Sequence, residues 1–159
     1  RVLLWNCRFL IVMDVKKVAA KDIRPLRNLV LRPNLPIETT FYDLDDDEKT
    51  FHLASIINDN IISIGTFYPE NDIKLKTKNG YRLRGMATHP DFRRKSAATK
   101  LMEESFVFLK QKKCDILWCN ARLIAVEFYK SLGFKIIGEI FDIPKIGPHY
   151  KMYKSIINQ

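Results

Sequence analysis

The amino-acid sequence predicts a mixed α/β fold in which helices pack against a β-sheet. Apolar segments of strand length alternate along the chain with segments that have the period of an amphipathic helix. Hydrophobic residues make up 47% of the 159 positions, and glycine and proline are few and scattered. Alternating strands and helices are typical of a sheet covered by helices, and this length suits one domain with a sizeable core.

The N-terminal half predicts a strand, a helix and a β-hairpin. Residues 14–19 have the pattern of a short strand, and the helix that follows begins at Lys21 and ends before Pro33. Residues 51–58 and 61–68 are two apolar runs separated by an Asp-Asn pair, which is the pattern of a hairpin.

The C-terminal half repeats the strand–helix order. Gly85 interrupts one apolar run, and glycine inside a strand often marks a bulge. Gly133 follows a helical run and suits a left-handed helix cap. The expected elements are a strand at 81–88, a helix at 96–112, a strand at 115–119, a helix at 123–132, and strands at 134–137 and 150–157.

The net charge of +9 is concentrated in residues 74–100, which hold nine basic residues and a single acid, Asp91. Such a balance indicates an anionic partner, whether nucleic acid, an acidic membrane surface or a phosphorylated small molecule. Elsewhere the charges nearly balance. We interpret the acidic segment 43–48 as a solvated loop, and attraction of a cationic amine is the alternative.

Cysteine usage and the N-terminus bear on where the protein works. The three cysteines form no C-x-x-C pair, which argues against a disulfide framework or a zinc site and favours a reducing, cytoplasmic setting. Residues 1–12 are apolar but shorter than a membrane span, and no cleavage-site pattern separates them from Met13. We expect residues 1–12 to be an extension from an artificial or misassigned start, and residues 13–159 to form a single domain.

Residues 93–98 (Arg-Arg-Lys-Ser-Ala-Ala) lie between a predicted strand and a predicted helix. The first turn of a helix offers free backbone N–H groups at the positive end of the helix dipole, and together these bind phosphate. The basic side chains add positive charge, and the small residues let a diphosphate approach the backbone. The pattern therefore predicts a pyrophosphate site, with a solvated basic loop as the alternative.

This order of features resembles the GNAT superfamily of N-acetyltransferases. The family signature, Gln/Arg-x-x-Gly-x-Gly/Ala after a strand and a proline-containing loop, is similar to residues 93–98, although Ser96 stands where the family usually has glycine. Residues 82–88 (Arg-Leu-Arg-Gly-Met-Ala-Thr) resemble the family's cofactor strand, and residues 128–134 resemble its Tyr-x-x-x-Gly-Phe hallmark. The likeness is closest to a bacterial subgroup with Arg-Gly-Met-Ala-Thr, Trp-Cys-Asn-Ala-Arg and Gly-Pro-His segments.

The resemblance implies a GNAT-like (acyl-CoA N-acyltransferase) fold, with a mixed central β-sheet, helices on both faces and a bulged cofactor strand. It also implies an enzyme that transfers the acetyl group of acetyl-CoA to a primary amine by direct attack, without a metal. A backbone N–H near Met86 would bind the oxyanion, and the strand would pair with the pantetheine arm. The residues that it assigns to acetyl-CoA are Met86, Ala87, Thr88, Arg93, Arg94, Lys95, Ser96, Ala97, Ala98, Thr99 and Asn120.

Tyr129 matches the family's general acid, because a phenol remains protonated at neutral pH. Its alternative role is that of a core tyrosine. Among general bases we rank His149 first, with His52, an acid or a relaying water as alternatives. Arg84 and Arg122 are the candidate substrate-binding residues, since arginines beside the cleft suit an acceptor with a carboxylate. Surface pairing with the Asp45 region is the alternative.

Two further functions stay open at this point. A GNAT fold can bind acyl-CoA as a sensor or scaffold without turnover, and the basic segment suits a nucleic-acid-binding module, although no zinc-finger spacing or RNP-type strand accompanies it. We expect acetyl-CoA and a small amine or peptide acceptor as partners, neither nucleic acid nor a membrane, and leave a homodimer open.

Overall fold

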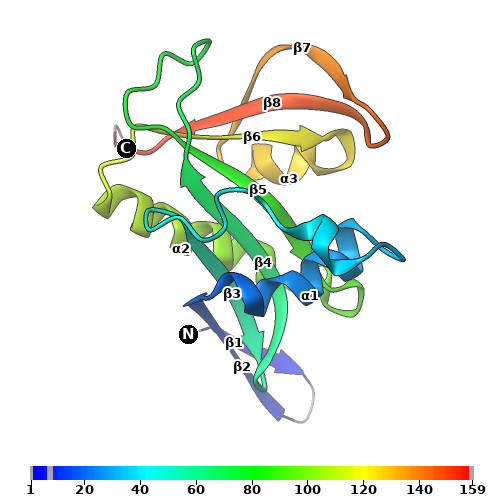
Figure 1. The fold of residues 1–159 in the computed structure, drawn as a ribbon. Coiled ribbons are helices and arrows are strands. Elements are labelled where there is room, and N and C mark those ends of the chain that lie inside the picture. The colour runs from blue at the N-terminus through cyan, green and yellow to red at the C-terminus, as the bar shows by residue number, and fades with distance from the viewer. Residues whose placement is uncertain (1, 7–8, 158–159) are drawn as a thin grey trace. The chain divides into compact units, whose positions relative to one another are not determined.

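The structure, a computed structural model, describes residues 2–6 and 9–157. The chain divides into two compact units. Figure 1 labels the helices and strands in chain order. Unit 1 comprises Arg1–Tyr68 and Gly85–Ser105, and unit 2 comprises Pro69–Arg84 and Phe106–Gln159. Each unit is described by itself.

Four strands of unit 1 pair in chain order, each antiparallel to the next. They are β1 (Val2–Asn6), β2 (Phe9–Val18), β3 (Phe51–Ile57) and β4 (Asn60–Pro69). Most residues of β3 and β4 are buried, including those whose side chains point to opposite faces of the sheet. Alternate side chains of a strand face opposite sides, so both faces of this hairpin are covered.

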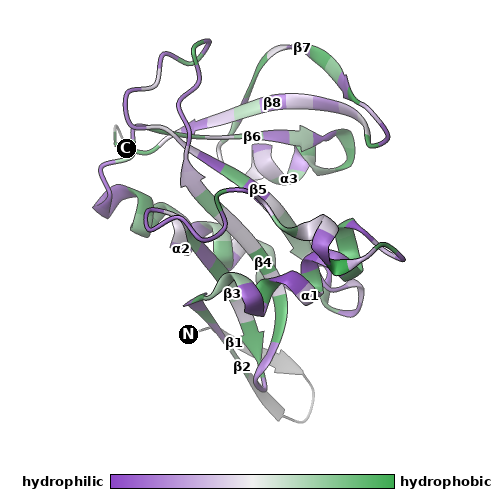
Figure 2. Ribbon diagram, in the orientation of Figure 1, coloured by the Kyte–Doolittle hydropathy of each residue, from purple (hydrophilic) through white to green (hydrophobic). Residues whose placement is uncertain are grey.

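The β3–β4 hairpin confirms the predicted pair of apolar runs. Its turn lies at Asn58 and Asp59, which have φ values of 48° and 62°. Asparagine and aspartate tolerate this left-handed region better than other non-glycine residues, and tight hairpin turns require it. Figure 2 shows apolar residues on β4 and hydrophilic residues on the connection from β4 to β5.

The helical elements of unit 1 include α1 (Ala20–Leu31), which follows β2. The Asp22 carboxylate accepts from the Ala19 backbone N–H at 3.2 Å and so caps the helix start. The buried face of α1 carries Ile23 and Leu26, which belong to one core cluster with residues of β3, β4 and β5. Three further helical elements begin in this unit: η1 (Ile37–Thr40), η2 (Pro90–Phe92) and α2 (Ala97–Gln111).

Unit 2 is built on a smaller mixed set of strands. The start of β5 (Tyr81–Thr88) pairs in parallel with β6 (Ile116–Arg122). Strand β6 is antiparallel to β8 (Gly147–Ser155), which is antiparallel to β7 (Lys135–Ile143). Strand β5 therefore begins in unit 2 and ends in unit 1.

Several elements differ from those predicted, and strands β6, β7 and β8 include residues outside the ranges expected for them, 115–119, 134–137 and 150–157. The helix expected at 123–132 is a 3-10 turn, η3 (Leu123–Ala125), followed by the short α3 (Val126–Ser131). Strand β2 begins before the predicted residue 14, and β1 was not predicted. These two strands pair with each other from Val2↔Met13 to Asn6↔Phe9, and such partner-dependent pairing is not visible in local sequence. Gly133 has the predicted left-handed conformation, with φ at 88°.

Candidate active site

Gly85 lies within β5 and has a φ of +64°, the left-handed conformation that favours glycine and that one residue of a common type of β-bulge adopts. The residues after it are held by β4. The Ser63 hydroxyl donates to the Ala87 carbonyl at 3.2 Å and lies 2.9 Å from the Thr88 hydroxyl. The His89 N–H donates to the Ile62 carbonyl at 2.8 Å. The positive φ of Gly85 is consistent with the predicted bulge, and the strand end after it is firmly attached to β4.

The segment after β5 forms the predicted basic turn before a helix. Arg94 and Ser96 have positive φ values of 60° and 64°, and α2 begins at Ala97. The Ser96 carbonyl accepts the first helical bond, from the Lys100 N–H at 2.9 Å. Ser96 thus occupies the left-handed conformation that the family's glycine would adopt freely, at a cost of about 1 kcal/mol.

The start of α2 is anchored, whereas the basic side chains before it are exposed. Ala97 is 2% exposed and belongs to a core cluster with Met13, Ile57 and Ile62. The Ser55 hydroxyl of β3 donates to the Ala97 carbonyl at 2.8 Å. The exposed residues of the turn are Arg93, Arg94, Lys95 and Ser96, and the half-buried ones at the helix start are Ala98 and Thr99. A fixed helix start with exposed positive charge is suited to bind an anion.

Tyr129 lies on α3 in unit 2 and is 6% exposed. Its hydroxyl lies near the Cys119 thiol of β6, and its ring packs beside Phe128 and Phe134 at centroid distances of 5.3 Å. Burial, and then the neighbouring Cys119, raise the pKa of Tyr129 well above its ordinary value. Burial likewise raises the pKa of Cys119 to about 12, so both groups are protonated at neutral pH.

The other predicted residues of unit 2 lie mainly on β6 and β8. Arg122 of β6 is paired in register with His149 of β8. His149 is 4% exposed, and its Nδ1 lies 2.7 Å from the Gly147 carbonyl oxygen, which can only accept. Nδ1 therefore carries the proton, and Nε2 of the neutral ring keeps its lone pair. The Asn120 amide oxygen is buried and has no hydrogen-bond partner within residues 2–6 and 9–157.

The predicted site residues are divided between the two units. Unit 1 holds the residues from Met86 to Thr99, and unit 2 holds Arg84, Asn120, Arg122, Tyr129 and His149. Within unit 1, the bulged strand end and the basic turn are both tied to the β3–β4 hairpin. Within unit 2, Arg122 and His149 face each other across neighbouring strands.

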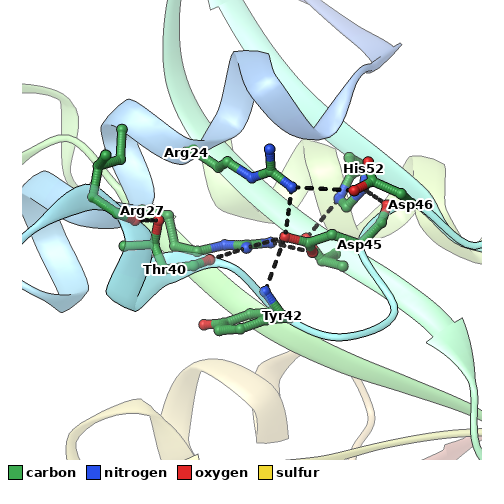
Figure 3. Close-up of polar contacts among 9 residues, drawn as sticks. Arg24, Arg27, Thr40, Tyr42, Asp45, Asp46 and His52 are labelled. Carbon is green, nitrogen blue, oxygen red and sulfur yellow. Dashed lines mark hydrogen bonds and ion pairs between the residues drawn. The ribbon is translucent and has the colours of Figure 1, made fainter.

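Unit 1 also contains a buried polar cluster that was not predicted from the sequence (Figure 3). Its centre is an ion pair in which the two Nη atoms of Arg27 donate to the two carboxylate oxygens of Asp45, at 2.8 and 3.1 Å. Nη1 also donates to the Thr40 carbonyl at 2.5 Å, and Nη2 donates to the Thr66 hydroxyl at 2.7 Å. Exposed fractions of the two charged side chains are 0% and 1%. The cluster therefore joins α1, η1, β4 and the acidic segment.

Asp45 corrects the interpretation of segment 43–48 as a solvated loop. The other five residues of the segment are exposed, but Asp45 is only 4% exposed. Burial works against its charge, yet the hydrogen bonds and charge of Arg27 hold the pKa of Asp45 below its ordinary value of 3.8. The carboxylate is thus a buried partner of Arg27, while Asp46 remains at the surface and pairs with Arg24 at 3.5 Å.

His52 of β3 completes the cluster, and its tautomer follows from its partners. Nε2 lies 2.9 Å from the Asp45 carbonyl oxygen, so Nε2 carries the proton. Nδ1 lies 2.8 Å from the Thr66 hydroxyl, which accepts from Arg27 and can donate to Nδ1. Burial lowers the pKa of His52 below 6.5, against the hydrogen bond to the Asp45 carbonyl, which raises it. Both ring nitrogens are engaged, which removes His52 from the candidate bases.

A weak signal for this cluster was present in the sequence. His52 and Thr66 are polar residues inside two apolar strand patterns, and Arg24 and Arg27 are spaced to lie on one face of α1. Buried polar groups need partners, so polar residues at such positions indicate a network. The identity of the partners depends on tertiary contacts up to 39 residues apart in the chain, as for Arg27 and Thr66.

The described part of the chain offers neither a metal cluster nor a membrane-spanning helix. Residues 2–6 and 9–157 contain no group of three or more His, Cys, Asp or Glu side chains arranged to hold a metal ion. Over the same residues, no helix has both the length and the apolar character needed to cross a membrane.

Comparison with known proteins identifies the class of protein. The sequence model of the acetyltransferase (GNAT) family matches residues 20–134, so the chain belongs to this family. The chain is also 37% identical over 145 residues to the uncharacterized N-acetyltransferase YitI of Bacillus subtilis (strain 168), covering 91% of this chain and 97% of the relative. The protein is thus a GNAT-family N-acetyltransferase.

Solved structures share the fold. An aminoglycoside 6'-N-acetyltransferase in complex with coenzyme A matches with a TM-score of 0.70 at 15% identity, over 92% of this chain and 98% of that one. The ribosomal-protein-S18-alanine N-acetyltransferase of Escherichia coli matches with a TM-score of 0.69 at 16% identity, over 91% and 94%. These matches confirm the predicted fold class.

Proposed function

We propose that this protein transfers the acetyl group of acetyl-CoA to a primary amine by direct attack of the amine on the thioester. The observation that carries the proposal is the order of the bulge at Gly85, the basic left-handed turn and the anchored start of α2 in unit 1. Free N–H groups at a helix start favour bound phosphate, and exposed basic side chains beside them add to that preference.

Each candidate residue is assigned one role in holding acetyl-CoA in this proposal. Arg93, Arg94, Lys95 and the N–H groups from Ser96 to Thr99 bind the pyrophosphate. The backbone from Met86 to Thr88 pairs with the peptide-like pantetheine arm. The buried amide oxygen of Asn120, which has no partner in the described chain, suits a donating amide N–H of that arm.

The chemical step needs an oxyanion donor, an acid and a base. We assign the backbone N–H of Met86 to the thioester carbonyl oxygen. As the amine forms its C–N bond and the C–S bond breaks, the Tyr129 hydroxyl gives its proton to the thiolate of CoA. Burial keeps that hydroxyl protonated at neutral pH, as the raised pKa of Tyr129 shows. The Nε2 of His149 takes the proton that the amine loses.

The acceptor is assigned only as a class. Arg84 and Arg122 favour an amine that also carries a carboxylate. The names of two structural neighbours point to acceptors as different as an aminoglycoside and the alanine of a ribosomal protein. A screen should therefore include small polyamines, amino acids and peptides, with release of free CoA thiol as the readout.

Replacement of Tyr129 by Phe tests the assignment. We expect turnover to fall about 100-fold or more, because general acid catalysis contributes about 10²- to 10⁴-fold. Binding of CoA, measured by calorimetry, should stay close to that of the unchanged protein. Phe128→Leu on the same helix is the control, since Phe128 has no proton to give. Unchanged turnover in Tyr129→Phe would remove Tyr129 from the mechanism, and CoA binding without turnover of any amine would favour a sensor.

A further inference from the structure

We propose that Arg27 is a positioning residue for the acetyl-transfer reaction. Its buried guanidinium packs against the backbone at Gly85. Through this contact it sets the position of the next backbone N–H, that of Met86. This inference rests on the role proposed above for Met86 as the donor to the thioester carbonyl oxygen. Arg27 itself would touch neither acetyl-CoA nor the acceptor.

Contact between Arg27 and the bulge is direct. A Cβ atom added at Gly85 would lie 3.0 Å from Arg27 Nε and 3.2 Å from Tyr42 Cε2. The same glycine has a φ of +64°. The backbone at the bulge therefore lies against the stacked pair of Arg27 and Tyr42, in which the guanidinium carbon is 3.9 Å from the ring centroid. Any movement of the guanidinium changes the surface on which the bulge rests.

The guanidinium is itself fixed in position and orientation. Its two Nη atoms make four hydrogen bonds, two to the Asp45 carboxylate, one to the Thr40 carbonyl and one to the Thr66 hydroxyl. These partners come from three separate parts of unit 1. The Thr66 hydroxyl is in turn bonded to His52 of β3. A planar group held on two edges in this way cannot rotate without breaking several bonds.

Energetic considerations indicate a role beyond packing. A buried ion pair is a weak source of stability, and apolar residues of similar volume often serve as well or better. Arg27 Nε is buried and has no hydrogen-bond partner in the described residues. The side chain thus leaves one donor unused while it keeps its contact with Gly85. A role in holding the backbone at Gly85 in place explains why Arg27 is rigidly paired, and why its Nε faces Gly85 although it has no hydrogen-bond partner there.

Positional accuracy matters at this point of the strand. A backbone donor stabilises an oxyanion when it lies about 2.7–3.1 Å from the oxygen. A displacement of about 1 Å at a reacting centre costs about 100-fold in rate. A lysine at position 27 keeps the charge and most of the length but not the bidentate pairing with Asp45. The bulge would then lose its fixed support.

The carbonyl stretch of bound acetyl-CoA tests this inference without an acceptor. We would record infrared difference spectra of acetyl-CoA labelled with ¹³C at the thioester carbonyl, bound to the full chain. In the unchanged protein, the hydrogen bond from Met86 should shift the band to lower wavenumber. In Arg27→Lys most of that shift should be lost, while the dissociation constant for acetyl-CoA stays nearly unchanged. Arg32→Lys at the end of the same helix is the control and should keep the shift, because the Arg32 guanidinium donates to the Leu31 carbonyl at 2.9 Å, outside the cluster.

Each outcome separates this inference from the proposed function. A full shift in Arg27→Lys would overturn the positioning role and leave the acetyltransferase proposal intact. Binding of acetyl-CoA to the unchanged protein without any shift would instead refute the role of Met86, and absence of binding would refute the proposed function. If Arg27→Lys does not fold, Asp45→Asn replaces it and should lose the same shift. With an amine from the screen, Arg27→Lys should lower kcat about 100-fold with little change in KM for acetyl-CoA.

Discussion

Unit 1 contains a buried arginine, Arg27, and a group of exposed basic residues between β5 and α2. The two differ in burial and in hydrogen-bond partners. Arg27 is fully buried, and its four hydrogen bonds lead to three partners within the protein. Arg93, Arg94 and Lys95 are exposed, and none of them pairs with a carboxylate within the described residues. Arg27 therefore supports the fold, whereas the three exposed residues are available to a ligand.

The physical reason for this difference is the cost of removing charge from water. A buried guanidinium is tolerated only when a carboxylate and further acceptors replace its hydration. An exposed arginine keeps its water until an anion displaces it, and charge-assisted hydrogen bonds to phosphate are strong. Substitutions in the two groups should therefore change different measured quantities.

The largest expected effect comes from breaking the buried pair. Arg27→Ala should lower the free energy of unfolding by about 3–5 kcal/mol, because it leaves Asp45 buried and without its main partner. Denaturant unfolding monitored by circular dichroism measures this. The double substitution Arg27→Met with Asp45→Leu removes both charges and should recover most of the loss. A double variant as unstable as Arg27→Ala would show that packing, not an orphaned charge, causes the effect.

The exposed group should affect ligand affinity and leave stability unchanged. Simultaneous replacement of Arg93, Arg94 and Lys95 by Ala should weaken CoA binding by about 10- to 100-fold, since a hydrogen bond to a charged group is worth about 1.5–3 kcal/mol. Calorimetry at two salt concentrations measures the affinity, and the difference should shrink as salt rises. The matched control removes three other exposed lysines, Lys21, Lys110 and Lys135. Equal weakening in the control would mean that net charge alone attracts CoA.

The same contrast explains what could be predicted from the sequence. The helices and strands that carry strong local patterns were predicted, as was the left-handed cap at Gly133. The basic turn is local as well, because a strand, a proline loop and a helix start follow one another within a few residues. Its predicted elements are present in the structure, from β5 through η2 to α2.

The buried cluster could not be predicted in the same way. Asp45 lies in a run of acids, and its neighbours Asp46 and Asp47 are exposed as expected for a loop. Only the fold selects Asp45 as the residue that reaches Arg27, 18 positions away in the chain. The bond from Ser55 to the Ala97 carbonyl, across 42 positions, is another contact that no local pattern contains. The roles proposed for Tyr129 and His149 stay predictions.

The smallest expected effect concerns Ser96. This residue follows the exposed basic residues in the chain, but we expect it to affect stability and not ligand affinity. Its φ of 64° lies in the left-handed region, which costs serine about 1 kcal/mol relative to glycine. Ser96→Gly should therefore raise the free energy of unfolding by up to about 1 kcal/mol and leave the affinity for CoA nearly unchanged. Thermal unfolding and calorimetry on the same variant measure both quantities. Tighter CoA binding without added stability would mean that the turn adopts its left-handed conformation only when the phosphates are bound.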